Sequence, residues 1–183
     1  MKRPPHVVLT AILFTLAAPA VGFLSFGIVP ALLFFSGYFA GFVFWLFAPG
    51  DAPLSAYRGA YVATFALFVV HRVEERLTGF FPWLAELTGV PVPNPLSPAI
   101  IILLLLSVAA WIGAPFLANR GSQFGQYLVW TFFGSMGVTE LAHFVLPFFT
   151  PDPFHYFPGM ASVFLLAPAA WFGMWLLWRG RPL

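Results

Sequence analysis

The chain contains no cysteine, and only 8% of its 183 residues are charged. The absence of cysteine excludes disulfides, iron–sulfur clusters and thiolate zinc sites, so any metal must be held by histidine, carboxylate or backbone oxygen. Soluble domains carry about 25% charged residues, whereas this chain is 61% hydrophobic. We therefore predict an integral membrane protein. The few basic residues form no stripe, which argues against nucleic-acid binding, and no motif indicates a nucleotide or haem.

Apolar segments separated by turns rich in proline, glycine and polar residues predict a single all-α domain, a polytopic membrane bundle of about six transmembrane helices. Gly37 and Gly41 lie four residues apart and predict a packing face of small residues. Residues 82–98 are expected to form a loop, because the alternating prolines of 91–95 cannot lie inside a helix. Whether this loop is a lid stays open. The expected spans are residues 7–26, 30–47, 58–81, 99–117, 126–149 and 158–178.

The distribution of charge predicts the orientation of the bundle. Basic residues gather at one set of expected helix ends, whereas the opposite loops hold Glu86 and Asp152 and neither Lys nor Arg. The positive-inside rule therefore places both termini in the cytoplasm. The basic residues at the cytoplasmic ends are Lys2, Arg3, Arg58, Arg120, Arg179 and Arg181.

One apolar segment contains five ionisable residues in six, His71-Arg72-Val73-Glu74-Glu75-Arg76. Placing such groups in hydrocarbon costs ~3 kcal/mol each, so their concentration indicates a function. In the predicted orientation this stretch lies in the outer half of the bilayer, at a depth shared with Glu140, His143 and His155. We expect these three segments to form one buried polar site.

The residue types and their spacing favour a divalent metal. His71, Glu74 and Glu75 are three and four residues apart, which places them near one face of a helix. Helix bundles use similar Glu-x-x-His pairs to hold metals, and imidazole with carboxylate suits one or two ions of zinc or iron. The expected metal ligands are His71, Glu74, Glu75, His143 and His155.

Other ionisable residues have expected roles around these ligands. The candidate catalytic carboxylates are those of Glu74, Glu75 and Glu140. Arg72 and Arg76 are expected to pair with the glutamates, and Tyr156 to donate its hydroxyl from the segment before the last span. The same ion pairs are also expected of a purely structural lock, because buried charges are usually paired.

His71-Arg72-Val73-Glu74-Glu75 resembles the motif that names the HXXEE family, small bacterial membrane proteins of undetermined function. Glu140-x-x-His143 and Tyr156-x-Pro158-Gly159 are similar to the second half of that family, and the resemblance covers roughly residues 60–175. It implies a shared polar site in a bacterial inner membrane and no particular reaction. Members often carry an amide at the position of Glu140, which implies a place beside the ligands for that residue.

Three functions fit such a site. The favoured one is a metalloenzyme acting on a lipid or other apolar small molecule, by hydrolysis rather than oxidation, because iron-dependent membrane oxygenases are richer in histidine. The second is a metal-free isomerase or cyclase, in which Glu and His exchange protons with an isoprenoid-like substrate. The third is a proton or cation transporter, against which stands the lack of polar residues in the cytoplasmic halves of the spans. The oligomeric state is left open.

Overall fold

The computed structural model describes residues 3–92, 94, 96–150 and 154–180, and every regular element within them is a helix. The predicted all-α class is confirmed. Lys2, Pro93, Pro95, Asp152 and Arg181 lie outside the described residues. In chain order the elements are α1 (Pro5–Phe26), α2 (Ile28–Phe47), α3 (Leu54–Thr78), α4 (Phe80–Thr88), α5 (Pro98–Leu104), the π-helix η1 (Leu105–Ala109), α6 (Ala110–Asn119), α7 (Gln123–Val138), η2 (Thr139–Leu141), α8 (Ala142–Val145), η3 (Leu146–Phe149) and α9 (Met160–Arg179).

Five helical stretches are long and apolar enough to cross a membrane. They are α1, α2, the run from α5 to α6, the run from α7 to η3, and α9. Large apolar side chains cover their outer surface, and Leu24, for example, is 83% exposed. Apolar exposure on this scale indicates a lipid environment. The sixth expected span, α3, has 25 residues and is long enough to cross, but its polar and ionisable residues make it less apolar than the other five.

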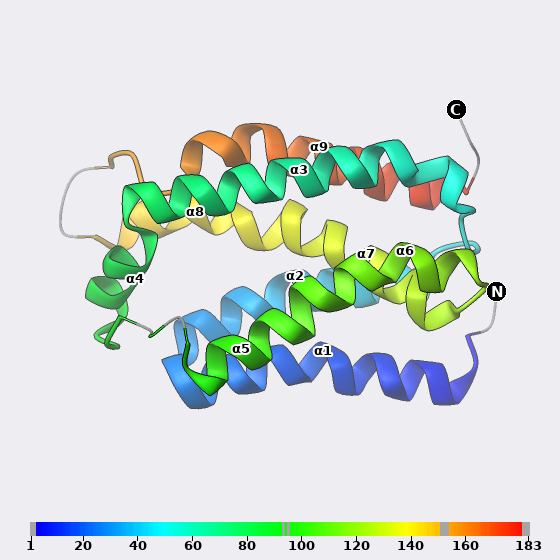
Figure 1. Cartoon of the computed structure of the whole chain (residues 1–183), viewed down its shortest axis with the longest axis horizontal. Coiled ribbons are helices and arrows are strands. Elements are labelled where there is room, and N and C mark those ends of the chain that lie inside the picture. The colour runs from blue at the N-terminus through cyan, green and yellow to red at the C-terminus, as the bar shows by residue number, and fades with distance from the viewer. Residues whose placement is uncertain (1–2, 93, 95, 151–153, 181–183) are drawn as a thin grey trace.

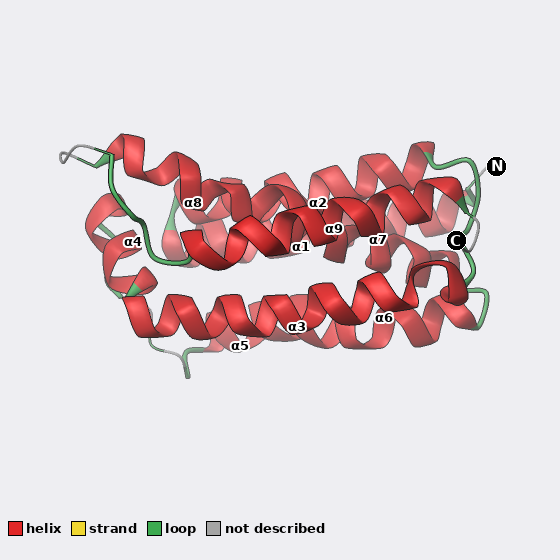
Figure 2. Cartoon of the chain, turned by 90° about the horizontal axis from the view of Figure 1, so that it is seen from above, coloured by secondary structure: helices red, strands yellow, loops and turns green. Residues whose placement is uncertain are grey.

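The long helices run side by side, and the start of α1 lies at the same end of the bundle as the end of α9 (Figure 1). The opposite end holds α4 and α8, as the view from above also shows (Figure 2). The prediction that 82–98 is only a loop is wrong, because α4 extends to Thr88. Pro82 lies in the first turn of α4, where a backbone N–H has no partner within the helix. Gly79, at φ +78°, ends α3 and lets the chain turn into α4.

The central helix of the bundle is α7, in which every residue from Gly125 to Gly137 is buried. The predicted packing face on α2 is confirmed: a Cβ added at Gly37 or Gly41 would come within 2.5 Å of an α7 backbone atom. The chain after Val138 continues as η2, α8 and η3 rather than as one straight helix. This firmly held α7 therefore leads directly into the irregular turns that carry Glu140 and His143.

Candidate metal centre

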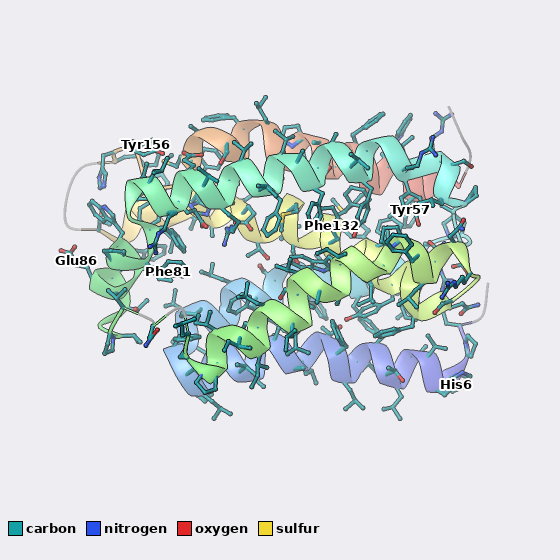
Figure 3. All side chains as sticks on the ribbon, viewed as in Figure 1. His6, Tyr57, Phe81, Glu86, Phe132 and Tyr156 are labelled. Carbon is teal, nitrogen blue, oxygen red and sulfur yellow. The ribbon has the colours of Figure 1, made fainter. Side chains whose placement is uncertain are left out.

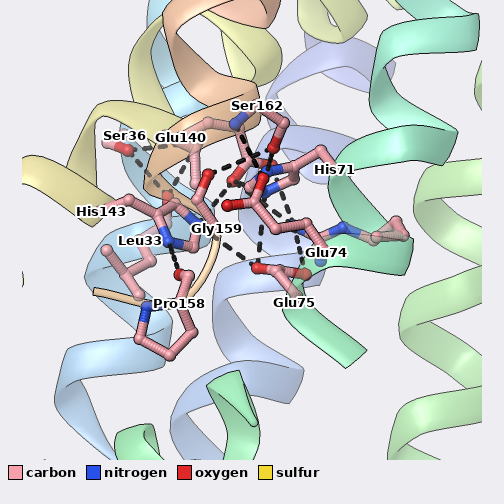
Figure 4. A network of polar contacts seen from close by, with 12 residues as sticks. Leu33, Ser36, His71, Glu74, Glu75, Glu140, His143, Pro158, Gly159 and Ser162 are labelled. Carbon is pink, nitrogen blue, oxygen red and sulfur yellow. Dashed lines mark hydrogen bonds and ion pairs between the residues drawn. The ribbon is translucent and has the colours of Figure 1, made fainter. Parts of the chain in front are cut away.

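Four buried side chains converge near the end of the bundle that lies away from the termini (Figure 4). His71 and Glu75 come from α3, Glu140 from η2 and His143 from α8. None is more than 7% exposed. One nitrogen or oxygen atom from each lies within 4.8 Å of the other three, which is close enough for all four to bind one metal ion. We call these four residues the His/Glu cluster.

Nitrogen and oxygen atoms alternate around the His/Glu cluster at similar separations. His71 Nε2 lies 3.5 Å from Glu75 Oε1 and 3.1 Å from Glu140 Oε2. His143 Nε2 lies 3.3 Å from the same two oxygens. Zinc binds such atoms at about 2.0–2.1 Å, and a tetrahedron with bonds of that length has edges of about 3.3 Å. The four nitrogen–oxygen separations are close to that length, and the donor atoms as a set lie within 4.8 Å of one another.

The outer nitrogens of both imidazoles are held by groups outside the cluster. His143 Nδ1 lies 2.5 Å from the carbonyl oxygen of Pro158, which can only accept, so this nitrogen carries the hydrogen. His71 Nδ1 lies 2.8 Å from the hydroxyl of Ser162, whose own hydrogen is directed to the carbonyl of Gly159 at 3.2 Å. Neutral imidazoles in these tautomers direct the lone pair of Nε2 into the cluster, as metal-binding histidines do.

With both imidazoles neutral in these tautomers, lone pairs converge from two imidazoles and two carboxylates, whereas a hydrogen on His71 Nε2 would be donated to Glu140 Oε2, 3.1 Å away. Glu75 Oε1 is buried and makes no hydrogen bond with any described residue. Such an atom is costly to bury unless a cation or a proton lies against it. The donor set fits a divalent ion, with backbone and hydroxyl acceptors behind both histidines to orient them.

The arginine that precedes the glutamates partly neutralises them. Arg72 Nη2 lies 2.8 Å from Glu75 Oε2 and 3.4 Å from both carboxylate oxygens of Glu140, and its side chain is 41% exposed. The expected Arg72–Glu75 pair is thus present. Arg76 is exposed and makes no ion pair with a described residue, so the structure gives it no place in the site.

Glu74, an expected ligand and catalytic group, lies outside the His/Glu cluster. Its carboxylate accepts hydrogen bonds from the backbone N–H groups of Ala161 at 3.0 Å and Ser162 at 2.7 Å, and from the hydroxyl of Tyr156. The reason is geometric, since adjacent residues on a helix point about 100° apart and Glu75 already faces the cluster. Partial burial and the nearby Glu74 carboxylate raise the pKa of Tyr156, which keeps its hydroxyl protonated.

His155 and Tyr156 are not brought to the cluster. The ring of His155 packs against that of Trp83 on α4, with 5.2 Å between centroids. His155 is not one of the four residues whose donor atoms converge. Tyr156 reaches Glu74 instead of the ligands. Both residues lie in the segment before α9, whose path cannot be read from helical spacing.

Three residues of the site escaped sequence reasoning: Pro158, Gly159 and Ser162. Gly159 has φ +96°, and a Cβ there would lie 2.5 Å from the His143 ring and 2.9 Å from the His71 ring. Glycine is therefore required both for the backbone conformation and for the space. The Tyr156-x-Pro158-Gly159 motif pointed to this turn, but its contact with the imidazoles depends on the tertiary fold.

An apolar cavity of about 230 Å³ adjoins the cluster, and Arg72, Glu75, Glu140 and His143 form part of its wall. Helix α4 covers it with Phe80, Phe81, Leu84, Ala85 and Thr88. Figure 3 shows Phe81 on the side of α4 that faces the bundle and Glu86 on the other side. The Phe80 ring also packs on His143, with centroids 5.0 Å apart. The segment after α3 thus covers both the cavity and the cluster.

No protein-family model, curated protein or solved structure matches this chain. The resemblance to HXXEE proteins therefore stays a prediction. The function has to be argued from the cluster and its cavity.

Proposed function

We propose that this protein is a multi-pass protein of the bacterial inner membrane, with α3 as its sixth span and both termini in the cytoplasm. Four of the six described basic residues support this orientation, because they lie at or near helix ends on the side of the termini: Arg3, Arg58, Arg120 and Arg179. The other two, Arg72 and Arg76, lie near the opposite end of α3, where Arg72 pairs with the buried glutamates. By the positive-inside rule the side of the termini is cytoplasmic, so the His/Glu cluster lies in the outer half of the membrane.

We further propose that the His/Glu cluster binds one divalent ion, with zinc favoured over iron, and that the protein is a metalloenzyme. One observation carries this proposal: four buried donor atoms from two histidines and two glutamates lie within 4.8 Å of one another, while groups outside the cluster bind the Nδ1 atoms of both imidazoles. Four donor atoms whose neighbours are 3.1–3.5 Å apart provide for one ion. A two-metal site would need ligands that bridge two ions about 3.5–4 Å apart.

The cavity indicates a lipid or another apolar molecule as substrate. Its wall is largely aromatic and aliphatic and includes Glu75, Glu140 and His143. A bound zinc ion would supply a Lewis acid, and it would also supply an activated water if it kept a coordination position beyond those filled by the cluster, as a five-coordinate ion does; both favour hydrolysis. Arg72 lines the same cavity and can stabilise negative charge that develops on a substrate.

A metal-free isomerase or cyclase is the second candidate, and the position of Arg72 favours it. Arg72 already balances one of the two buried carboxylates. One proton shared between an imidazole and a carboxylate would neutralise the rest and supply an acid and a base beside the cavity. This alternative predicts turnover of an isoprenoid-like molecule without a metal.

Metal content separates the two candidates. The protein should be made without a histidine tag, purified in detergent and measured by mass spectrometry for zinc and iron. About one equivalent of zinc supports the hydrolase, and one equivalent of iron redirects the assays to oxidation. Less than about 0.1 equivalent, even after zinc and iron are added to the growth medium, overturns the metal centre and favours acid–base catalysis.

A further inference from the structure

The cavity beside the His/Glu cluster extends along the bundle, away from the cluster. On α3 its wall begins at Phe68, seven residues before Glu75, which corresponds to roughly 10 Å along the helix axis. The wall at this end includes Trp111, whose ring centre lies 6.1 Å from that of Phe68. The hydroxyls of Tyr38 and Ser107 in the wall bond each other at 2.7 Å. The end of the cavity remote from the cluster therefore suits hydrocarbon.

Arg72 lies where the apolar part of the cavity meets the cluster. Its Nη2 atom is paired with Glu75 and Glu140, and its guanidinium carbon lies 5.5 Å from the ring centre of Phe68. The Nε and Nη1 atoms of Arg72 make no hydrogen bond with any described residue. The side chain is 41% exposed, so much of it is open to a ligand. Arg72 can therefore donate hydrogen bonds to an oxygen of a molecule in the cavity.

The distance from Arg72 to Trp111 limits the chain that can lie between them. Because Phe68 is 5.5 Å from the guanidinium carbon and 6.1 Å from the Trp111 ring, the two ends are at most about 12 Å apart. An extended hydrocarbon chain advances by ~1.25 Å per bond, so this distance corresponds to about eight to ten carbons.

The volume of the cavity gives a similar length. An apolar cavity of about 150 Å³ can hold one benzene molecule, which has six carbons. At the same density, the volume of about 230 Å³ holds about nine carbons. The cavity is therefore matched to one chain of medium length and is too small for a lipid with two long chains.

We propose that the cavity binds an acyl chain of about eight to ten carbons, with its carbonyl oxygen at Arg72 and its far end at Trp111. The carbonyl oxygen accepts hydrogen bonds from the unpaired N–H groups of Arg72. Because the Arg72 side chain reaches the surface, the alcohol or amine attached to the acyl group can extend out of the cavity. The ligand is thus an ester or amide of a medium-chain fatty acid.

That such an ester is also the substrate rests on the proposed function. Its carbonyl would lie beside Glu75 and Glu140, because Arg72 pairs with both. In the hydrolysis, the oxygen of a water molecule bonds to the acyl carbon while the bond from that carbon to the alcohol oxygen breaks. The products are a carboxylic acid and an alcohol, and no further reactant is needed.

The test uses bromine as a short-range quencher of tryptophan fluorescence, on the full chain in detergent. Methyl 8-bromooctanoate is compared with methyl 16-bromohexadecanoate, whose chain is too long, and with 1-bromooctane, which has no carbonyl. Saturating octanoate should lower the fluorescence of the parent protein and that of Trp111→Phe much less. Dissociation constants come from the rise of the melting temperature with probe concentration, corrected for partition of each probe into micelles. The octanoate should bind at least about tenfold more tightly than either other probe.

The role of Arg72 is tested by a pair of variants. In Arg72→Gln the preference for the octanoate over 1-bromooctane should fall below about twofold, because the donors are removed. Arg76→Gln is the matched control, because Arg76 lies one turn further along α3 and is not among the residues that line the cavity. It should keep the preference. If Arg72→Gln does not fold, the two probes still test recognition of the carbonyl on the parent protein.

Equal binding of the octanoate and 1-bromooctane by the parent overturns the proposal. So does quenching that is undiminished in Trp111→Phe, or a hexadecanoate that binds as tightly as the octanoate. The metal measurement is independent of these results. A protein that contains zinc but lacks the preference would contradict only the acyl site, and a protein without metal that shows it would contradict only the metalloenzyme.

Discussion

Glu74 and Glu75 are adjacent in the sequence and identical in chemistry, yet they lie in opposite kinds of surroundings. Glu74 accepts two backbone N–H groups at the start of α9 and the Tyr156 hydroxyl. Glu75 directs one oxygen at two imidazole nitrogens and finds no hydrogen-bond donor for it among the described residues. The first carboxylate is satisfied by the fold, whereas Oε1 of the second, whose Oε2 is paired with Arg72, is satisfied only if a cation or proton joins it.

The difference shows how a carboxylate that stabilises the fold can be told apart, inside a membrane, from one that is placed to bind a cation or a proton. A helix N-terminus offers unpaired N–H groups and a partial positive charge, so a glutamate there stabilises the docking of a helix. An oxygen of a glutamate that faces lone pairs alone costs free energy to bury. Five predictions would break or sharpen this contrast.

The largest expected effect is the loss of bound metal on changing Glu75 alone. Glu75→Gln should reduce zinc from about one equivalent to below about 0.1, because an amide is a much weaker ligand than a carboxylate. Glu74→Gln should keep at least about 0.7 equivalent, since its carboxylate binds α9. Equal losses in both variants, measured by mass spectrometry, would remove the distinction between the two residues.

The histidines should repeat the result obtained with Glu75. His71→Ala and His143→Ala are each expected to reduce metal below about 0.1 equivalent, because each removes one of the four proposed ligands. Arg76→Ala is the control, as this exposed residue makes no ion pair with a described residue. Stoichiometric metal in both histidine variants would refute the ligand assignment.

Gly159 should affect the centre without contributing a ligand. Gly159→Ala forces a Cβ to within 2.5 Å of the His143 ring and strains a residue at φ +96°, so we expect metal affinity to fall about 10- to 100-fold. Strain of this kind should also reduce stability by about 1–3 kcal/mol. Competition with a zinc chelator gives the affinity.

Gly113→Ala is the control for Gly159, because a Cβ at that position on α6 meets nothing within 4 Å. It should leave the affinity unchanged and stabilise the helix slightly. A similar loss of affinity in both variants would mean that the centre responds to any perturbation of the bundle.

Glu74 should matter mainly for stability. Glu74→Gln weakens two charge-assisted bonds to the start of α9, and we expect a loss of about 1–2 kcal/mol. Thermal unfolding in detergent measures it, with Glu86→Gln on the exposed side of α4 as a neutral control. No destabilisation relative to that control would contradict the structural role of Glu74.

The smallest expected effect belongs to Tyr156. Tyr156→Phe removes one hydrogen bond to Glu74 from a half-exposed residue, which should cost about 0.5–1 kcal/mol and no metal. The same unfolding assay measures it. A loss of metal in this variant would bring Tyr156 into the centre, as sequence reasoning had expected.

Much of this arrangement could be predicted from the sequence, because helical periodicity and the cost of burying charge act locally. The all-α class, the Gly37–Gly41 packing face and the convergence of His71 and Glu75 with Glu140 and His143 follow from such rules. Glu74 was misassigned because it follows His71 by three residues, and on α3 that spacing allows its side chain to point either toward the His/Glu cluster or toward α9. Only the packing of α9 decides between them.

Other features depend on parts of the chain that helical rules do not describe. Helix α4 was missed because the prolines of 91–95 were taken to make all of 82–98 a loop, although α4 ends at Thr88 and Pro82 lies in its first turn. The placement of His155 against Trp83 depends on an irregular segment. Ser162 looks like an ordinary small residue of an apolar helix, and its role appears only when α3 and α9 meet.

Ser162 connects the two carboxylate environments. Its backbone N–H binds Glu74, while its hydroxyl holds the outer nitrogen of His71. The docking of α9 and the orientation of a ligand histidine are therefore one event. By thermodynamic linkage, an ion that binds the oriented imidazole more tightly must also strengthen the docking of α9. Docked α9 must in turn raise the affinity for the ion by the same factor. If the cluster binds an ion as proposed, protein without that ion should begin to unfold at the start of its last helix.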